Sequence, residues 1–363
     1  MRNWKILHKI LICNSFIILS TLPTFGQRIQ PIGNHLDLVD TSNGALRLRY
    51  TDFMIPARGE DLNFVRVYNN QSQYNGPLGH NWHFNWNLTL NYRPSETVKA
   101  MKRIYEEGNT IPTTIIGPTI KTTPEKVTII ETNGFLREFK KEEDKFVSIH
   151  FDIVTVKRIE GGFILEYLDG RKYYFTRLIE KAPMPIPPNT QKIWIDSKGN
   201  KHIEIKYFSN SGEREVYKLS KIVDRYGNTT VFDYDSRNRL ISITDPAGRG
   251  LTFRYTPKDK LQTITDPLGR KVTFEYNHQD ELVKVIDPAG SVITFEYDTR
   301  HNITKITYPG DAILMIRYDR NNRVESLTGP VDNTTYFSYQ TTGQGKGLIT
   351  TITDALGNKT IHD

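Results

Sequence analysis

The sequence has 363 residues, of which 25% are charged, 11% aromatic and 37% hydrophobic, and its net charge is +7. The aromatic content and the small net charge argue against a disordered chain, and the modest apolar share favours sheets with one face in water. Only one long apolar run occurs, from residue 10 onward, which excludes a transporter with several membrane-spanning helices.

Residues 1–26 have the pattern of a secretory signal peptide. A basic start precedes the apolar stretch Ile10–Leu22, and Thr24-Phe25-Gly26 offers small residues for cleavage before Gln27. An uncleaved anchor is the alternative, but this stretch is short for a bilayer span. We therefore expect a secreted or cell-surface protein with no membrane span after cleavage.

The predicted leader also removes features that could suggest other chemistry. It holds the only cysteine, Cys13, so the mature chain is expected to have no disulfide and no thiol chemistry. It carries three of the seven net positive charges, which leaves +4 on the mature chain. So small a charge gives no electrostatic reason to expect a nucleic-acid partner.

The region from 93 to 190 is rich in strand patterns but has no repeat. Phe163–Tyr167 and Lys172–Phe175, joined through Asp169-Gly170, predict a β-hairpin. Residues 95–108 carry apolar side chains at helical spacing, so a helix is an alternative to strands there. Residues 182–188 are too proline-rich for a central strand and predict an ordered linker.

A strict repeat governs the sequence after about residue 191. Tyrosines recur every 21 residues, prolines do the same, and aspartates followed three residues later by glycine keep that interval. The positions are Tyr234, Tyr255, Tyr276, Tyr297, Tyr318 and Tyr339; Pro246, Pro267, Pro288, Pro309 and Pro330; and Asp224/Gly227, Asp245/Gly248, Asp266/Gly269 and Asp287/Gly290. Self-similarity at a fixed period indicates a repeat architecture.

Each repeat unit is predicted to be a β-hairpin. Apolar and polar residues alternate in Leu240–Thr244 and Leu251–Tyr255, as in strands. In Asp245-Pro246-Ala247-Gly248 the aspartate can accept a backbone hydrogen bond, the proline fixes φ and the glycine permits a positive φ. Thr256-Pro257-Lys258-Asp259 predicts the second turn. Successive hairpins would form an antiparallel meander.

The repeat tyrosines lie two residues after phenylalanines on the same strand face, as at Phe253, Phe274 and Phe295. We therefore expect them to build the packed side of the sheet rather than a sugar-binding ladder. Carbohydrate binding through polar residues of the opposite face remains an alternative.

The repeat becomes irregular toward the end of the sequence. Four residues are inserted around 341–347, and the next turn is Asp354-Ala355-Leu356-Gly357. The tyrosine expected ten residues after Asp354 would fall one position beyond Asp363. We therefore expect a fragment or a truncated product.

The repeat resembles that of the Rhs, or YD-repeat, family, whose tyrosine–aspartate pairs occur here as Tyr234-Asp235, Tyr297-Asp298 and Tyr318-Asp319. Earlier segments resemble the domain that precedes the repeats in many bacterial members: Gly44, Asp52, and the stretches 55–59 (IPARG), 66–72 (RVYNNQS) and 76–82 (GPLGHNW). The two resemblances cover about residues 33–92 and 190–363.

This resemblance implies a spiralling β-sheet that forms a hollow shell. Bacterial members of the family enclose and deliver a C-terminal toxin in it, and the related teneurins use it in cell-surface adhesion. The family's self-cleaving core region is not found in this sequence, and about seven repeats are few for a closed shell. The resemblance therefore implies shell-wall architecture and neither toxicity nor autoproteolysis.

The sequence predicts no catalytic, cofactor-binding or metal-binding residues. The motifs G-x-S-x-G and H-E-x-x-H do not occur, and Gly343–Gly347 has the wrong spacing for a phosphate loop. His80 and His83 flank Trp82, but residues three apart on a strand face opposite sides, so packing with Trp82 and Trp86 is favoured over a shared metal.

Acidic residues are also expected to have structural or solvent-facing roles. The repeat aspartates could line up as a Ca²⁺ site, but one carboxylate per turn favours turn stabilisation. Glu106-Glu107 and Glu142-Glu143-Asp144 are interpreted as solvated loop charges.

We therefore predict an all-β protein with an N-terminal β-domain (27–92), a strand-rich region (93–190) and a YD-repeat array (191–363) that forms a spiralling, partial β-shell. Its predicted function is an exported scaffold that encloses or presents a toxin or another polypeptide cargo. The alternative is a surface adhesin that binds carbohydrate or a partner cell. An enzyme is the least favoured reading.

Overall fold

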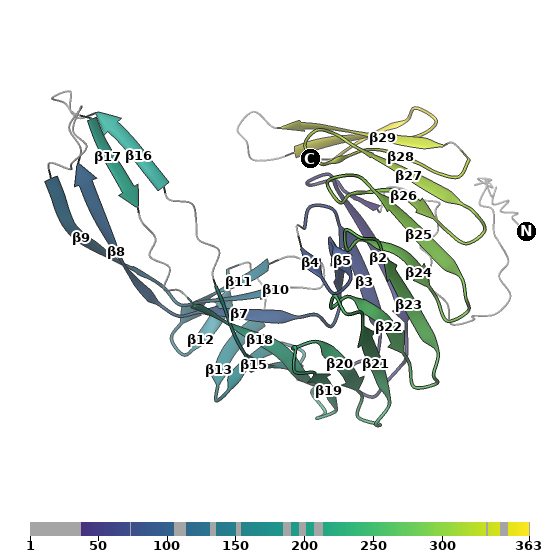
Figure 1. The fold of residues 1–363 in the computed structure, drawn as a ribbon, viewed down its shortest axis with the longest axis horizontal. Helices are drawn as coiled ribbons and strands as arrows, with labels where there is room; N and C mark the ends of the chain where they lie inside the picture. The colour runs from purple at the N-terminus through teal and green to yellow at the C-terminus, as the bar shows by residue number, and fades with distance from the viewer. Residues whose placement is uncertain are drawn as a thin grey trace, which may run out of the picture.

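The computed structural model of the protein describes residues 38–72, 74–104, 114–130, 136–149, 154–183, 190–195, 201–206, 213–331, 333–341 and 348–362. Within 96–123 and 178–214 only the backbone is described. The described elements are all β-strands (Figure 1). Among these residues there is no helix with the length and apolar character needed to cross a membrane. The predicted all-β class is confirmed, and the predicted leader lies outside the described residues.

The N-terminal strands form a small four-stranded sheet in the order β1-β2-β3-β6. Its strands are β1 (Val39–Asp40), β2 (Ala45–Phe53), β3 (Phe64–Asn69) and β6 (Trp82–Phe84). Between β3 and β6 the chain makes a tight hairpin of β4 (Asn75–Gly76) and β5 (Gly79–His80), called the 75–80 hairpin below.

Eight strands then close into a ring in which each strand pairs antiparallel with its neighbours. Strand β7 pairs with both β10 and β18, and this double pairing closes the ring. Its interior is filled by apolar side chains at alternate positions, such as Leu90, Val127 and Phe163. The strands are β7 (Thr89–Arg93), β10 (Lys126–Ile130), β11 (Leu136–Glu142), β12 (Lys145–Ser148), β13 (Val154–Ile159), β14 (Gly162–Tyr167), β15 (Lys172–Pro183) and β18 (Glu213–Val223).

Two ribbons extend from this ring, at the upper left of Figure 1. One pairs β8 (Glu96–Ile104) with β9 (Thr114–Thr123), and the other pairs β16 (Thr190–Ile195) with β17 (Lys201–Lys206). The helix considered for 95–108 is therefore wrong over 96–104, and residues 105–108 lie outside the described part. A partner strand rich in Thr and Ile supplies the hydrogen bonds that a helix would have made internally.

The repeat array continues the sheet from β18 as an antiparallel meander, in which each strand pairs with the next along the chain. Each unit adds a six-residue and a five-residue strand in the regular part. The strands are β19 (Thr229–Tyr234), β20 (Leu240–Thr244), β21 (Gly250–Tyr255), β22 (Leu261–Thr265), β23 (Lys271–Tyr276), β24 (Leu282–Ile286), β25 (Val292–Tyr297), β26 (Ile303–Thr307), β27 (Ile313–Tyr318), β28 (Val324–Thr328), β29 (Thr334–Thr341), β30 (Leu348–Thr353) and β31 (Lys359–His362).

The packed face of the array lies against the N-terminal sheet. The ring of Phe64 in β3 lies 6.0 Å from Phe253 and 6.4 Å from Phe274, and Trp82 in β6 lies 5.3 Å from Phe295. The N-terminal strands, the ring and the array share one buried cluster. Segments more than 200 residues apart in sequence are therefore held in one core.

Several further sequence predictions can be compared with this fold. The hairpin of Phe163–Tyr167 and Lys172–Phe175 is confirmed by the pairing of β14 with β15. The proline-rich linker begins later than predicted, because Ala182 and Pro183 still pair within β15, and 184–188 lie outside the described residues. The domain boundaries at 92 and 190 remain predictions.

Candidate functional site: the docking rim

Every regular turn of the array has the same five-residue backbone. In Asp245–Arg249 the Asp245 carboxylate oxygen Oδ1 accepts hydrogen bonds from the backbone N–H groups of Ala247 (2.9 Å) and Arg249 (2.8 Å). The Gly248 N–H donates to the Asp245 carbonyl at 3.0 Å, and Gly248 has φ +78°. The predicted role of the repeat aspartates in stabilising turns is confirmed by these bonds.

The turns lie alternately on two edges of the sheet, and the edges differ at the fourth residue, where φ is positive. On one edge the turns 224–228, 245–249, 266–270, 287–291 and 354–358 have a glycine there, and we call this edge the glycine rim. The turn 308–312 on the same edge is an exception, with Asp311 at φ 63°. We call the edge with turns 235–239, 256–260, 277–281, 298–302 and 319–323 the docking rim. Its fourth residues are Asn238, Asp259, Asp280, His301 and Asn322, all with φ between 59° and 65°.

The repeat tyrosines fix the backbone next to the docking rim. Each tyrosine hydroxyl donates to the backbone carbonyl 15 residues earlier, at 2.6–2.8 Å. The acceptors are Leu219, Leu240, Leu261, Leu282, Ile303 and Val324. The rings pack against the core, as predicted, and burial raises the pKa of Tyr276, Tyr297 and Tyr318 far above the ordinary value. Phenylalanine would leave these carbonyls without that partner.

The N–H groups at three of the same positions bind the N-terminal domain. The Leu261 N–H donates to the Pro77 carbonyl (2.7 Å), the Ile303 N–H to the Tyr68 hydroxyl (3.1 Å) and the Val324 N–H to the Gly44 carbonyl (2.9 Å). Leu261, Ile303 and Val324 pair with repeat tyrosines, and the strand register shifts directly before each of these tyrosines. The N-terminal domain thus satisfies backbone donors along the docking rim.

Side chains of the N-terminal domain also bind the turns themselves. The Asn70 side-chain amide donates to the Asn322 carbonyl (2.9 Å), and that of Asn81 donates to the His301 carbonyl (3.2 Å). The Lys260 ammonium donates to Asn75 Oδ1 (2.6 Å) and to the Gly76 carbonyl (3.0 Å). Four of the five docking turns therefore contact residues before β7.

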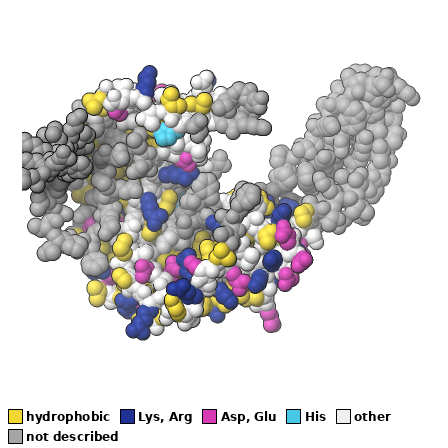
Figure 2. Space-filling model, turned by 180° about the vertical axis from the view of Figure 1, so that it is seen from behind, with side chains coloured by type: hydrophobic (Ala, Val, Ile, Leu, Met, Phe, Trp, Pro, Cys, Tyr) yellow, Lys and Arg dark blue, Asp and Glu magenta, His cyan; other side chains and the backbone are white. Residues whose placement is uncertain are grey.

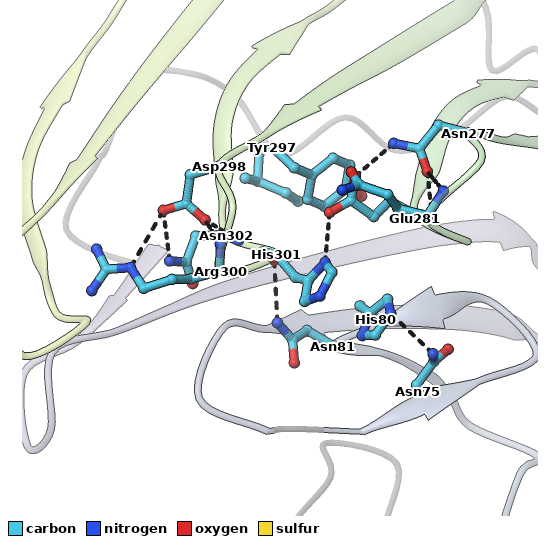
Figure 3. A network of polar contacts seen from close by, with 12 residues as sticks. Asn75, His80, Asn81, Asn277, Glu281, Tyr297, Asp298, Arg300, His301 and Asn302 are labelled. Carbon is cyan, nitrogen blue, oxygen red and sulfur yellow. Dashed lines mark hydrogen bonds and ion pairs between the residues drawn. The ribbon is translucent and has the colours of Figure 1, made fainter.

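Neighbouring docking turns are linked by a ladder of polar contacts. The fifth residue of one turn reaches the fourth residue of the next: Arg239 binds Asp259, Glu281 binds His301 and Asn302 binds Asn322, each at 2.7 Å. In Figure 3 the turns 277–281 and 298–302 of this ladder lie above the segment that carries Asn75, His80 and Asn81. Lys260, which occupies the fifth position of its turn, is directed to the hairpin instead.

Two histidines stack where the hairpin meets the rim (Figure 3). The His80 and His301 rings have centroids 3.8 Å apart and planes 3° apart. His301 Nδ1 contacts the buried Glu281 carboxylate, and His80 Nε2 contacts the Asn75 side-chain amide at 3.0 Å. Burial is the main cause that lowers the pKa of His80.

A buried ion pair lies under this interface. The Arg66 guanidinium Nε donates to Asp52 Oδ2 at 2.8 Å, and both side chains are fully buried. The guanidinium carbon lies 4.2 Å from the Tyr50 ring centroid and 5.2 Å from that of Trp82. Burial raises the pKa of Asp52 despite the opposing effect of Arg66.

His83 and His80 have different partners. They lie on separate strands, β6 and β5, with Asn81 at a φ of 65° between them, so the spacing argument for a single strand does not apply. Its Nε2 contacts the Ser72 hydroxyl at 2.6 Å, and its ring stacks on Tyr74 with centroids 4.4 Å apart. Burial lowers the pKa of His83 to about 4, so the imidazole is a weak base. The contact fits a packed core better than general-base catalysis.

The predicted packing roles of Trp82 and Trp86 are confirmed, since both are buried and Trp86 lies 5.4 Å from Phe232. Glu142, Glu143 and Asp144 are exposed, as predicted, whereas Glu106, Glu107 and residues 343–347 lie outside the described part. No group of three or more potential metal ligands occurs among the residues that the structure describes.

On the face shown in Figure 2, Lys and Arg side chains are interspersed with Asp and Glu. The ion pairs of the described residues include Lys305–Glu296 (2.8 Å) and Lys157–Glu166 (2.7 Å).

The docking rim itself was missed by reasoning from the sequence. Its residues show no motif, but one signal was available. Positions 238, 259, 280, 301 and 322 follow the 21-residue period and are never glycine, although the turn needs a positive φ there.

Two family models match the sequence. Residues 218–354 match the model described as teneurin YD-shell, and residues 36–112 match a domain of unknown function, DUF6531. These matches confirm the resemblance of the tyrosine repeat to YD-repeat proteins. Within residues 218–354 the repeat sequence is therefore similar to that of YD-shell proteins.

Solved structures of much longer chains also match. The Photorhabdus luminescens Tc holotoxin pore with a substitution in TccC3 is 9% identical, with 87% of this chain and 21% of that chain covered and a TM-score of 0.30. TcdB2-TccC3 without its hypervariable C-terminal region is 13% identical, with 86% and 19% covered and a TM-score of 0.32. This chain spans about a fifth of their length. No curated protein matches the sequence.

Proposed function

We propose that this chain, whose repeat region belongs to the YD-repeat family, is an exported scaffold that forms the first part of a β-shell around a polypeptide cargo. The observation that carries this proposal is the uninterrupted pairing from β18 to β31 with one register repeated in every regular unit. Such a sheet grows only by adding hairpins at its edge, which suits a wall.

The docking rim gives the wall a defined beginning. The N-terminal domain covers the packed face of the array and binds turn after turn of one edge, so the first repeats need no earlier hairpins to bury their aromatic side chains. We infer that the N-terminal domain closes the start of the shell. Catalysis is no part of the proposed role.

The test uses the native gene with the DNA that follows codon 363, expressed with its leader in a host that exports proteins. We expect a longer product or a neighbouring frame that supplies a polypeptide, and we expect protease to leave that polypeptide intact until the sheet is unfolded. A toxin-like sequence downstream would support the cargo role. Immediate digestion of the polypeptide by protease would contradict it.

The adhesin alternative predicts a different outcome. A stop after codon 363, followed by an unrelated frame, together with binding of the secreted chain to a glycan array or to partner cells, would support adhesion through the polar outer face. Export itself is tested by mass spectrometry of the secreted product, which should begin at Gln27.

A further inference from the structure

The contact between His80 and Asn75 has a fixed direction. The Lys260 ammonium, a donor only, lies 2.6 Å from Asn75 Oδ1, so the Asn75 amide nitrogen faces His80 Nε2 at 3.0 Å. That nitrogen donates, and His80 Nε2 must therefore accept and carry no proton. A proton placed on Nε2 would set an N–H against the N–H groups of Asn75.

The stack on His301 opposes the same proton. The His301 ring lies 3.8 Å from His80, and its Nδ1 contacts the Glu281 carboxylate at 2.7 Å. This neighbouring imidazole disfavours a charge on His80. The groups that act on His80 come from three docking turns. Burial is the largest effect that disfavours a charge on His80, and His301 and Lys260 also disfavour it. Glu281 and Asp280 favour the charge.

We propose that His80 is an acid-sensitive latch between the N-terminal domain and the docking rim. When His80 takes up a proton at Nε2 from solvent, the Asn75 hydrogen bond is lost and a positive charge is placed in the ring that stacks on His301. The 75–80 hairpin then separates from the rim more easily.

The sign of the effect follows from the two states of the hairpin. His80 binds a proton less readily when docked than when released, because the pKa in the docked state is lowered from about 6.5. The docked state is therefore favoured fully above about pH 6.5, and this preference is lost as the pH falls through the docked-state pKa.

Other contacts of the hairpin do not titrate in this range. The Pro77 carbonyl accepts from the Leu261 N–H, and Gly79 packs against the Asp280 carbonyl. We therefore expect local loosening rather than unfolding of the sheet.

The test is hydrogen–deuterium exchange of the complete chain at pH 7.5 and 5.5, corrected for intrinsic exchange rates. Amides of residues 74–81 should lose protection about threefold or more at pH 5.5, whereas those of the turn 245–249 should not change. His80→Gln should remove this response. His278→Gln, an exposed histidine on the β23–β24 turn, should keep it.

Asn75→Asp provides a sharper control, because an aspartate accepts a hydrogen bond from protonated His80. This variant should show no loss of protection in acid, or a gain. Equal acid responses in the natural chain and His80→Gln, or no response in the natural chain, would overturn the latch.

Discussion

The two rims of the array use the same turn, yet they place different residues at its left-handed position. On the glycine rim, a Cβ added to Gly227, Gly248, Gly269 or Gly290 would meet nothing within 4 Å. On the docking rim the same position holds Asn, Asp or His, and side chains such as Asp259, His301 and Asn322 contact the preceding turn. His301 also stacks on His80 of the N-terminal domain. Glycine is used where only the backbone shape matters.

The difference shows that strain is accepted where contacts compensate for it. A residue other than glycine with positive φ costs about 1–2 kcal/mol. On the docking rim four of the five such residues have side-chain contacts that glycine cannot make, namely Asp259, Asp280, His301 and Asn322. The N-terminal domain contacts both rims, since the Arg249 side chain donates to the Pro56 carbonyl at 2.7 Å. On the docking rim, however, four of the five turns contact it, and every turn has a residue other than glycine at the left-handed position.

The largest expected effect separates two glycines that both have positive φ. Gly79→Ala would place a Cβ against the Asp280 carbonyl oxygen in the docked hairpin, so the hairpin must move; we expect a loss of about 3 kcal/mol or more of unfolding free energy. Gly248→Ala has open space and should cost only about 1 kcal/mol. Urea denaturation of both variants measures the difference between their free energies of unfolding. Equal losses would show that the hairpin is not packed on the rim.

The second prediction concerns the charge in a glycine-rim turn. Although burial raises the pKa of Asp245, hydrogen bonds from the Arg249 backbone and side chain outweigh it and lower the pKa. Asp245→Asn should therefore lose about 1–2 kcal/mol at pH 7, since the amide opposes the Arg249 guanidinium.

The dependence of this effect on low pH provides the control for the prediction. A lowered folded pKa means that the stabilisation is present above about pH 4 and is lost as the pH falls through the folded value. The gap between the natural chain and Asp245→Asn should shrink in acid, as thermal unfolding across pH would show. A constant gap would mean that the charge is irrelevant to the turn.

The third prediction compares a repeat tyrosine with an exposed one. Tyr276→Phe removes a hydroxyl that donates to the Leu261 carbonyl at 2.7 Å and also lies 3.2 Å from the Pro77 carbonyl. Losing these buried bonds should cost about 1 kcal/mol. Tyr226→Phe on the glycine rim, where the ring is 73% exposed, should change little. Chemical denaturation measures the free energy of unfolding of both variants. An equal loss in the two would contradict the role of the Tyr276 hydroxyl.

Much of the fold could be predicted because the repeat is local. The alternation in Leu251–Tyr255 and the Asp-Pro-x-Gly turns specify each hairpin within about ten residues of sequence. The helix considered for 95–108 was wrong over 96–104, because the helical spacing of a few apolar side chains is a weaker constraint than a partner strand. The local sequence pattern was sufficient to predict the repeat array. It was insufficient for 96–104, where pairing with β9 determines the structure.

The docking rim could not be predicted because it joins segments that lie more than 180 residues apart. Asn70, Asn81 and Lys260 are ordinary polar residues in the sequence, and only the packing of β3 and β6 on the array brings them to their partners. His80 was weighed as a ligand beside His83, whereas its partner is His301. Contacts between segments so far apart in the sequence produce no recognisable spacing pattern.

The smallest expected effect tests whether the side-chain contacts of the docking-rim residues offset the free-energy cost of their positive φ. Asn322→Gly relieves a positive φ of 65° but removes the side-chain bond from Asn302 at 2.7 Å. The two terms are similar in size, so the free energy of unfolding should fall by less than about 1 kcal/mol. Asn238→Gly is the matched control, because no side-chain bond of Asn238 to another turn offsets its strain among the hydrogen bonds described, and this change should be neutral or stabilising. Paired denaturation curves measure the difference. If Asn322→Gly stabilises the chain as much as Asn238→Gly, the ladder between docking turns contributes nothing, and the identity of these residues must have another cause.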